Sequence, residues 1–548
     1  MNATDGQPHE VSLYWDVSGE IAVNCSEDAA VWSRFQVDDL AVLSCSSKDQ
    51  NILSRSGDNL RIDWGHAYFA VPATSGETFV GSAEKARERF VGDGGLPCRD
   101  DLERAACSPG RMPVMAVHFG LGQVGNKNVQ RHAMLAYDDL YSLEYLQRRI
   151  RPWWRRNGME AADLLAEGET AFEAIHRECE EYDATLMERL SAAGGEKYAQ
   201  LCALAFRQCL AAHKLAADHD GSPLYLSKEN FSNGCIATVD VTYPSSPFFL
   251  ALNPTLLKAQ LTPILEYAQS SRWKFPFAPH DLGTYPLANG QVYGGGEKTE
   301  QDQMPVEECG NMLLLVAAVA IREGSVDDAL RWWPMLKQWA SYLCEKGLDP
   351  ENQLCTDDFA GHLAHNTNLS LKAILAIAAY AKLAKMAGKT DEALEYRQAA
   401  EQMAASWMEM ADDGDHYRLT FDKPGTWSQK YNLVWDRLLG LDLFPAHVAR
   451  REVAFYQTQQ NRYGLPLDSR NSYTKLDWIV WSASLSESQE MFRALVDPLH
   501  DWAHESVSRV PLTDWYQTTG TGAQVAFQAR SVVGGLFIQL LSPDPVVP

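Results

Sequence analysis

The chain has 548 residues, of which 46% are hydrophobic and 22% charged, which is the composition of a globular protein. Its length exceeds the roughly 250–300 residues that one hydrophobic core supports, so we expect at least two domains. A formal charge of −24 argues against the cationic surface that nucleic-acid binding requires. The longest apolar runs, such as 312–321, are about half of the ~20 residues in a membrane-spanning helix, which argues against membrane insertion.

The N-terminus and the cysteines give little indication of targeting or metal binding. Residues 1–7 contain neither a basic nor an apolar region, so the sequence shows no export signal. The eleven cysteines are dispersed and form no Cys-x-x-Cys pair, so we expect mostly buried thiols, with one or two disulfides left open. We expect no metal ion and no cofactor.

The pattern is mostly extended up to about residue 150. Residues 11–17 and 60–64 alternate apolar and polar side chains, which is typical of half-buried strands. Turn-forming residues such as Ser18-Gly19 separate these runs. The pattern predicts an antiparallel β-sandwich.

Beyond residue 160 the apolar residues recur with the 3.6-residue period of helices, which come in pairs. One pair stops at Gly324 and restarts at Ser325, whose hydroxyl can cap the next helix. A second pair stops at Gly388 and restarts at Thr390. We expect twelve helices, near residues 160–190, 195–217, 254–270, 305–323, 325–346, 368–387, 390–412, 431–441, 446–460, 475–485, 487–506 and 522–541.

Twelve helices in six hairpins predict an (α/α)6 toroid. The fold class is therefore a multidomain β + α chain, with a β-sandwich over residues 1–150 and a six-hairpin barrel over residues 151–548. An open α-solenoid is the alternative, but its turns would be short, whereas the loops before alternate helices here are long and polar.

In a closed ring of hairpins, the loops that lead into the inner helices meet at one mouth. These loops combine carboxylates with His, Trp and Tyr, a mixture suited to a concave site for a small polar substrate. The candidate substrate-binding residues are His280, Asp281, Asp357, His362, His365, Asn366, Lys430, Trp435, Asp436, Arg470, Lys475, Trp478, Asp514 and Trp515.

The candidate catalytic residues are carboxylates. Glu307-Glu308 and Asp357-Asp358 are doublets whose adjacent side chains diverge, so we expect one of each pair, Glu308 and Asp358, to point into the mouth. Asp477 is the third candidate. The alternative for each doublet is structural, with Glu307 and Glu308 stabilised by the helix dipole and the aspartates capping a helix.

Signals for a metal site or a nucleophile are weak. His362 and His365 do not have a zinc-ligand spacing, so we expect hydrogen-bonding histidines. No Gly-x-Ser-x-Gly elbow occurs, and the Ser-x-x-Lys pairs at 82–85 and 472–475 match a pattern that is common by chance. Residues 294–296 are three glycines without the context of a phosphate loop.

Several long strings of these loops resemble one family. They are SNGCIATVDVTYPSSPFF, FAPHDLGTYPLANGQ, QMPVEECGNM, CTDDFAGHLAHNTNLS, TWSQKYNLVWDRLLG, GLPLDSR and YTKLDWI. In this order they closely resemble fungal glutaminase A and its bacterial relatives, over roughly residues 10–541. The resemblance implies a β-rich N-terminal region, a six-helical-hairpin domain, a secreted or periplasmic location, and hydrolysis of L-glutamine to L-glutamate and ammonia. The export signal and proline-rich stretch usual in the family do not precede residue 9 here.

Three functional interpretations stay open. As a glutaminase, the chain would use Glu308 or Asp358 to activate water, while Lys430, Arg470 or Lys475 holds the substrate carboxylate. As a glycosidase, it would pair Glu308 with Asp358 or Asp477 as acid and base. The third possibility is a carbohydrate-binding protein without catalysis. Each predicts a small polar ligand, an amino acid or a sugar, and none involves nucleic acid or a membrane.

Overall fold

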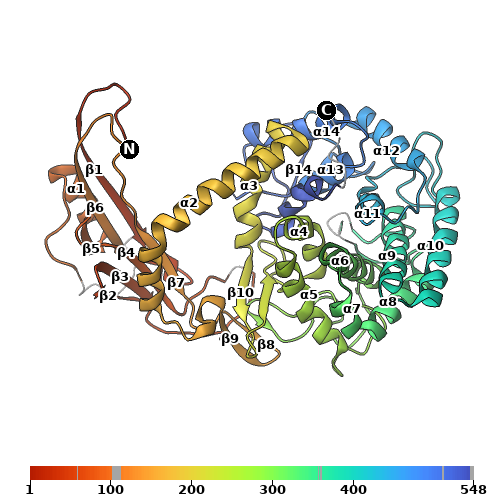
Figure 1. Ribbon diagram of the computed structural model, residues 1–548, viewed down its shortest axis with the longest axis horizontal. Coiled ribbons are helices and arrows are strands. Elements are labelled where there is room, and N and C mark those ends of the chain that lie inside the picture. Colours follow the sequence, from red (N-terminus) through yellow and green to blue (C-terminus); the bar gives the residue numbers. More distant parts are fainter. Residues whose placement is uncertain (59, 102–112, 356, 358–360, 509–510, 543–548) are drawn as a thin grey trace. The chain divides into compact units, whose positions relative to one another are not determined.

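The computed structural model describes residues 1–58, 60–101, 113–355, 357, 361–508 and 511–542, and the chain divides into two compact units (Figure 1). The first comprises Met1–Glu181 and Ala216–Ser222, and the second comprises Tyr182–Leu215 and Pro223–Pro548. Over these described ranges, no helix has the length and the apolar character that crossing a membrane requires.

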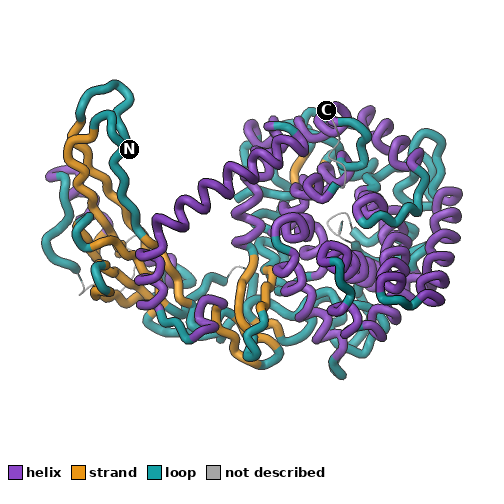
Figure 2. The backbone as a smooth tube through the Cα atoms, in the orientation of Figure 1, coloured by secondary structure: helices purple, strands orange, loops and turns teal. Residues whose placement is uncertain are grey.

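Two antiparallel sheets build the first unit, and Figure 2 shows their strands in orange. One sheet has the order β1-β6-β5 and the other has the order β2-β3-β4-β7. The strands are β1 His9–Ser18, β2 Ala30–Val37, β3 Leu40–Ser47, β4 His66–Pro72, β5 Glu77–Ser82, β6 Pro113–Val124 and β7 Met134–Asp138. Buried side chains of both sheets, including Leu43 and Phe69 from one and Val117 and Phe119 from the other, form one hydrophobic core. The predicted β-sandwich is confirmed.

The strand predicted at residues 60–64 is wrong, because β4 begins only at His66. Side-chain hydrogen bonds hold this segment in place of a strand ladder. Asn51 donates to the Asp63 carboxylate at 3.1 Å, and the Trp64 indole donates to the carbonyl of Tyr141 at 3.0 Å. Residues 60–64 therefore form an irregular loop, in which the polar Asp63 is as buried as Trp64 and burial does not follow the alternation.

Shorter elements complete the first unit. They are the 3-10 helices η1 Gly19–Ala22 and η2 Trp153–Asn157, the helix α1 Ala83–Asp93, and the strands β8 Leu143–Tyr145 and β9 Arg148–Pro152. The helix α2 Ala161–Gly194 and the strand β10 His213–Ala217 each contain a boundary between the two units.

A ring of helices forms the second unit (Figure 1). Six inner segments contact one another in succession, and the last contacts the first, so the ring is closed. In order they are α4 Val239–Leu252, α6 Pro305–Glu323, α9 Thr367–Met386, η4 Tyr431–Leu433 with α11 Val434–Leu438, α13 Leu476–Ala483 and the 3-10 helix η5 Ser531–Leu541. The (α/α)6 toroid predicted from the hairpin pattern is confirmed.

Outer helices follow the inner ones along the chain. They are α5 Pro254–Gln269, α7 Asp327–Arg331 with α8 Trp333–Lys346, α10 Thr390–Met410, α12 Ala446–Gln459 and α14 Gln489–Glu505. The remaining outer helix is α3 Glu196–Ala211, which packs against η5 and α14. The unit also contains the short strands β11 Pro223–Ser227, β12 Leu287–Ala288, β13 Tyr473–Lys475 and β14 Trp515–Gln517.

The helix stops predicted at glycines are confirmed. Gly324 and Gly388 both adopt the left-handed conformation, with φ of 68° and 72°, where a side chain would be strained. The hydroxyl of Ser325 accepts a hydrogen bond from the backbone N–H of Asp327 at 3.2 Å. Local capping chemistry therefore fixes these two hairpin turns.

The inner helix α4 was not predicted. Pro244 and Pro247 lie within it, and proline lacks the N–H that helix hydrogen bonds require. Nearly every residue from Val239 to Ala251 is buried between ring neighbours, so tertiary packing compensates for the interrupted hydrogen bonds.

Three other helix predictions need correction. The helix expected over 195–217 ends at Ala211, and residues 213–217 form β10. The helix expected over 522–541 starts at Ser531 and is a 3-10 helix; within it, Gly534 and Gly535 lie too close to the carbonyls of Ser245 and Pro244 to be replaced by a residue with a side chain. The helix expected over 325–346 is divided into α7 and α8 at Trp332.

Candidate active site

The entrances to α4 and α6 and the loop containing His280 bring three titratable side chains together. Asp240 is the second residue of α4, and Glu308 lies in the first turn of α6. The loop is held against the start of α4 by backbone pairing, since the N–H of Val239 donates to the carbonyl of His280 at 2.8 Å. The local backbone therefore presents His280 to both carboxyl groups.

Asp240, His280 and Glu308 form a compact buried cluster. One carboxylate oxygen of each acid and a ring nitrogen of His280 all lie within 4.8 Å of one another. The Nε2 atom of His280 is 3.7 Å from Asp240 Oδ1. Glu308 Oε1 is buried and receives no hydrogen bond from the described residues, while its Oε2 accepts one from Asn311 at 3.1 Å.

Burial and the neighbouring charges set opposite protonation tendencies in this cluster. Burial, followed by the nearby charge of Asp240, raises the pKa of Glu308 well above its ordinary value. Burial alone would lower the pKa of His280, but Asp281, Asp240 and Glu308 together raise it to about 10. Both shifts favour the protonated form, that of the Glu308 carboxyl group and that of the His280 ring.

Asp281 fixes the orientation of the His280 ring. His280 Nδ1 lies 3.0 Å from Asp281 Oδ2, and the ring stacks on Tyr293 with centroids 4.0 Å apart. The Asp281 carboxylate also accepts backbone N–H bonds from Gly283, Val292 and Tyr293, at 2.7, 3.1 and 3.1 Å. Because Nδ1 is held by Asp281, the opposite nitrogen, Nε2, faces Asp240.

Glu307 points elsewhere and is paired. Its carboxylate forms an ion pair with Lys372 of α9, and Lys372 donates to Asn311 Oδ1 at 2.7 Å. Lys372 also lies 4.1 Å from the ring centroid of Tyr243. These contacts connect α6 to α9 and α4, so the two adjacent glutamates differ in their surroundings: Glu307 pairs with Lys372, whereas Glu308 faces Asp240 and His280.

Asp357 is buried, and its carboxyl group feels the charges of Glu307 on α6 and of Lys475 at the end of β13. Burial of its carboxyl group raises its pKa to about 7, Glu307 adds to this, and the hydroxyl of Tyr431, which donates to Oδ2 at 3.0 Å, opposes it. Tyr431 stacks on Trp478 with centroids 4.0 Å apart and an interplanar angle of 3°. Its neighbour Asp358 lies outside the described residues, so the structure gives no placement for that candidate.

A chain of buried ion pairs lies at the start of α13. Lys475 Nζ is 2.8 Å from Asp514 Oδ2, and Arg530 is 2.6 Å from the same carboxylate oxygen. Arg530 also lies 3.4 Å from Glu229. Although burial opposes it, Arg530 and then Lys475 hold the pKa of Asp514 well below its usual range. Asp514 is therefore an anion shared by two cations.

Asp477 differs from Asp514, although both are fully buried. Neither oxygen of Asp477 receives a hydrogen bond within the described part of the chain, and Lys475 Nζ lies 3.7 Å from Oδ1. Burial raises the pKa of Asp477 to about 6, which Asp514 reinforces and Lys475 reduces. Asp477 is thus a second carboxyl group that is poised to exchange a proton near neutral pH.

Several predicted binding residues make contacts that hold loops. Lys430 is buried and donates to the carbonyls of Tyr417 and Ser428, at 3.1 and 2.9 Å, and burial lowers its pKa to about 8. The Asn366 side chain caps the start of α9. Asp436 accepts the backbone N–H groups of residues 443 and 444.

The remaining predicted residues lie at different depths. Trp435 and Trp478 are fully buried, whereas Trp515 is partly exposed. Arg470 forms a two-point ion pair with Asp468. His362 and His365 differ from the buried His280, because their side chains are exposed. They face the surface acids Asp302 and Asp349.

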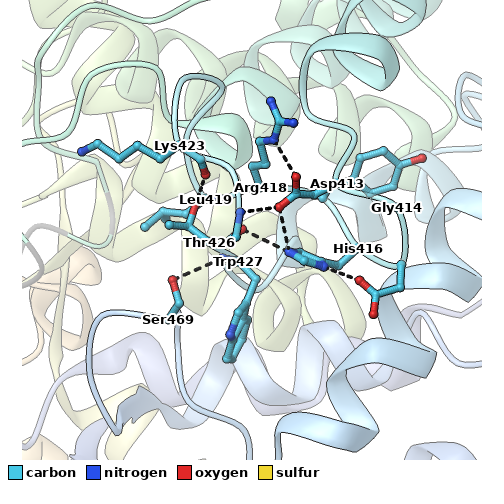
Figure 3. Close-up of polar contacts among 12 residues, drawn as sticks. Asp413, Gly414, His416, Arg418, Leu419, Lys423, Thr426, Trp427 and Ser469 are labelled. Carbon is cyan, nitrogen blue, oxygen red and sulfur yellow. Dashed lines mark hydrogen bonds and ion pairs between the residues drawn. The ribbon is translucent and has the colours of Figure 1, made fainter.

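The loop between α10 and η4 is cross-linked to the loop that carries Arg470 (Figure 3). Asp413 accepts from Arg418 Nε at 3.0 Å and from the backbone of Gly425 at 2.6 Å, and it lies 3.5 Å from His416. The backbone N–H of Trp427 then donates to Ser469 Oγ at 3.2 Å, next to Arg470. This network fixes the backbone on that side of the mouth.

Neither Ser-x-x-Lys pair provides an activated serine. Ser82 caps α1 by accepting the backbone N–H of Lys85. Ser472 donates to Gln517 at 2.9 Å, while Lys475 is bonded to Asp514. Nucleophilic catalysis by serine needs a base beside the hydroxyl. The contacts at these two serines are those of structural residues.

Two groups of three or more His, Cys, Asp or Glu side chains in the described ranges have a spacing that could hold a metal ion, and both contain His280. One is the cluster with Asp240 and Glu308, and the other joins His280 to Cys235 and Asp281. A metal ion would have to displace the protons that the raised pKa values hold on His280 and Glu308. The cluster is better suited to proton transfer.

Asp240 is the site residue that sequence reasoning missed. Asp240 lies on α4, which was not predicted because it contains two prolines. The residue is nevertheless part of the string SNGCIATVDVTYPSSPFF, which carries the family resemblance. The useful signal was the position of a lone acid at the start of a nearly continuous apolar segment.

Comparison with known families gives matches over nearly the whole chain. The model of the Glutaminase A six helical-hairpin domain matches residues 195–540, and a domain of unknown function matches residues 1–189. Glutaminase A of Aspergillus oryzae is 34% identical over 556 residues, covering 99% of this chain and 79% of the relative. A probable glutaminase of Arthroderma benhamiae is 27% identical, covering 96% and 72%.

Similar solved structures are more distant in sequence. A bacterial glucoamylase complexed with acarbose has a TM-score of 0.46 at 8% identity, covering 99% of this chain and 91% of that one. A metal-independent α-mannosidase of Streptococcus pneumoniae also has a TM-score of 0.46, at 10% identity, covering 66% and 97%.

Proposed function

The chain belongs to the glutaminase A family of six-helical-hairpin hydrolases, and we propose that it hydrolyses the side-chain amide of L-glutamine to L-glutamate and ammonia. The observation that carries this proposal is the pairing of Glu308 with Asp240. Burial and the charge of Asp240 keep the proton on Glu308, as in carboxyl pairs that share one proton. The names of the relatives support glutamine as the substrate.

In the proposed reaction the carboxyl pair activates water directly. Asp240 accepts a proton from the water as its oxygen bonds to the amide carbon. Glu308 donates its proton to the amide nitrogen, the C–N bond breaks, and ammonia leaves. The proton on Asp240 then passes to Glu308, which restores the pair. The imidazolium of His280 offsets the negative charge that moves between the two acids.

The spacing of Asp240 and Glu308 is compatible with the proposed activation of water. The facing oxygens of Asp240 and Glu308 lie within 4.8 Å, which suits one water held between two carboxyl groups.

Glycoside hydrolysis is the second candidate, and Asp477 is the observation that favours it. This carboxyl group is buried, its pKa is raised to about 6, and neither oxygen receives a hydrogen bond within the described ranges. In that reaction Glu308 would protonate the leaving oxygen, and Asp477 would activate water or attack.

A parallel assay separates the two candidates. Purified protein is incubated with L-glutamine and with a panel of nitrophenyl glycosides, and ammonia and nitrophenol are measured. We expect ammonia, formed in equal amount to glutamate. Glu308→Gln and Asp240→Asn should each lower kcat/KM by about 10²–10⁴-fold, the usual contribution of a general acid or base. Glu323→Gln, at the solvent end of the same helix, is the matched control and should keep full activity.

The outcomes are distinct. Sugar release without ammonia would overturn the glutaminase proposal and leave Glu308 and Asp477 as the acid–base pair. Ammonia release that survives both Asp240→Asn and Glu308→Gln would place the reaction elsewhere in the protein.

A further inference from the structure

A pair of histidines on the outside of the ring has the geometry of a metal chelate. His500 and His504 are four residues apart on α14, so they lie on one face of the helix. Their Nε2 atoms are 3.1 Å apart, and the two rings are tilted toward each other with centroids at 4.3 Å. This region is outside the site described above, and the proposed reaction does not use it.

The neighbouring helix supplies a third donor. Gln200 of α3 places its Oε1 atom 2.9 Å from His500 Nε2. The amide of Gln200 is oriented by Glu196, one turn earlier on α3, whose carboxylate accepts from Gln200 Nε2 at 3.0 Å. The amide oxygen is therefore turned toward the histidines from across the junction between α3 and α14.

These separations match the spacing of ligands on one metal ion. Imidazole nitrogens bind zinc at about 2.0–2.1 Å. With angles between 90° and the tetrahedral value at the metal, two such nitrogens are about 2.9–3.4 Å apart. The observed N···N distance of 3.1 Å and the N···O distance of 2.9 Å both fall in this range.

We propose that His500, His504 and Gln200 bind a divalent transition-metal ion of the class that prefers imidazole, such as Zn²⁺. Two nitrogens and one amide oxygen leave a further position for water. The charges around the site are mixed, with Lys197 close to both Asp497 and Asp501.

The position of the site links metal binding to the stability of the folded ring. α3 and α14 are the outer helices at the junction where the last hairpin of the ring meets the first helix of the second unit. A metal ion held by both helices stabilises the folded ring, since it has no such site in the unfolded chain. Catalysis at Glu308 is not involved.

The test is Zn²⁺ binding to protein without an affinity tag, measured by isothermal titration calorimetry. We expect one ion per chain and a rise in Tm when Zn²⁺ is added. His504→Gln removes an exposed ligand and should weaken binding by at least about tenfold and abolish the rise in Tm. His447→Gln, at an exposed histidine on α12, is the control and should bind as the unsubstituted protein does.

Two results would overturn the proposal. One is the absence of Zn²⁺ binding by the unsubstituted protein. The other is binding that His504→Gln leaves unchanged but Asp240→Asn removes, which would place the ion at His280. Cu²⁺ gives a separate readout, because electron paramagnetic resonance should show two coordinated nitrogens in the unsubstituted protein and one in His504→Gln.

Discussion

The entrances to α6 and α13 contain similar buried acids in opposite electrostatic states. At α6, Glu308 lies beside another acid and a single histidine, and its pKa is raised. At α13, Asp514 lies between Lys475 and Arg530, and its pKa is lowered. Burial disfavours the charge of both groups, so the difference comes from the neighbours alone.

This difference distinguishes an acid that can transfer a proton from an acid that holds the structure together. A carboxyl group that retains its proton near neutral pH can donate it, whereas one held between two cations cannot. Asp514 joins the segments around residues 475 and 530, and its role is to hold them together. The state of each acid, more than its presence in the mouth, indicates its function.

The largest expected effect on stability comes from removing the shared anion. Asp514→Asn leaves Lys475 and Arg530 buried without their carboxylate and should lower the free energy of unfolding by about 3–5 kcal/mol. Glu308→Gln replaces an already neutral group and should change it by less than about 1–2 kcal/mol. Denaturant unfolding at pH 7 measures both, and equal losses would mean that the two acids do not differ in state.

The next effect is the pH dependence that Asp477 imposes. Its pKa is about 6 in the folded protein against the ordinary value of 3.8, so the folded state holds an extra proton between pH 4 and 6. Stability from this group is present below about pH 4 and is lost as pH rises through 6, by about 3 kcal/mol. Asp477→Asn cannot titrate and should remove this contribution.

Unfolding free energies at pH 4, 5 and 6 provide the measurement. The difference between the unsubstituted protein and Asp477→Asn should change steadily with pH, in favour of the variant at pH 6. A constant difference across this range would mean that Asp477 is ionised throughout.

Most of the fold followed from local patterns. The period of 3.6, the glycine stops at 324 and 388 and the alternation of residues 11–17 specify hairpins and strands without tertiary information. α4 did not follow, because Pro244 and Pro247 oppose a helix and only packing inside the ring overrides them. Propensity is a local quantity, whereas this helix depends on the closed ring.

The site was predictable in composition but not in pairing. The sequence gave Glu308 and Asp477 as catalytic candidates and His280, Lys475 and Asp514 as binding candidates, without indicating which of them meet. Which acid faces which cation depends on loops that approach from distant parts of the chain, as with Asp514 and Arg530. Asp240 was missed because its helix, α4, was not predicted.

The smallest expected effect concerns His365, which the sequence analysis grouped with His280 among the candidate substrate-binding residues. His365 is exposed, and its pKa is raised by a surface bond to Asp349 at 2.8 Å, whereas His280 is fully buried between Asp281 and Asp240. His365→Gln should change kcat/KM by less than about twofold and the free energy of unfolding by less than about 0.5 kcal/mol. His280→Gln should lower kcat/KM by at least about tenfold, because the cation beside the carboxyl pair is lost. Steady-state kinetics of the two variants side by side decide the matter: a large loss in His365→Gln would extend the functional site to the surface loop after α8.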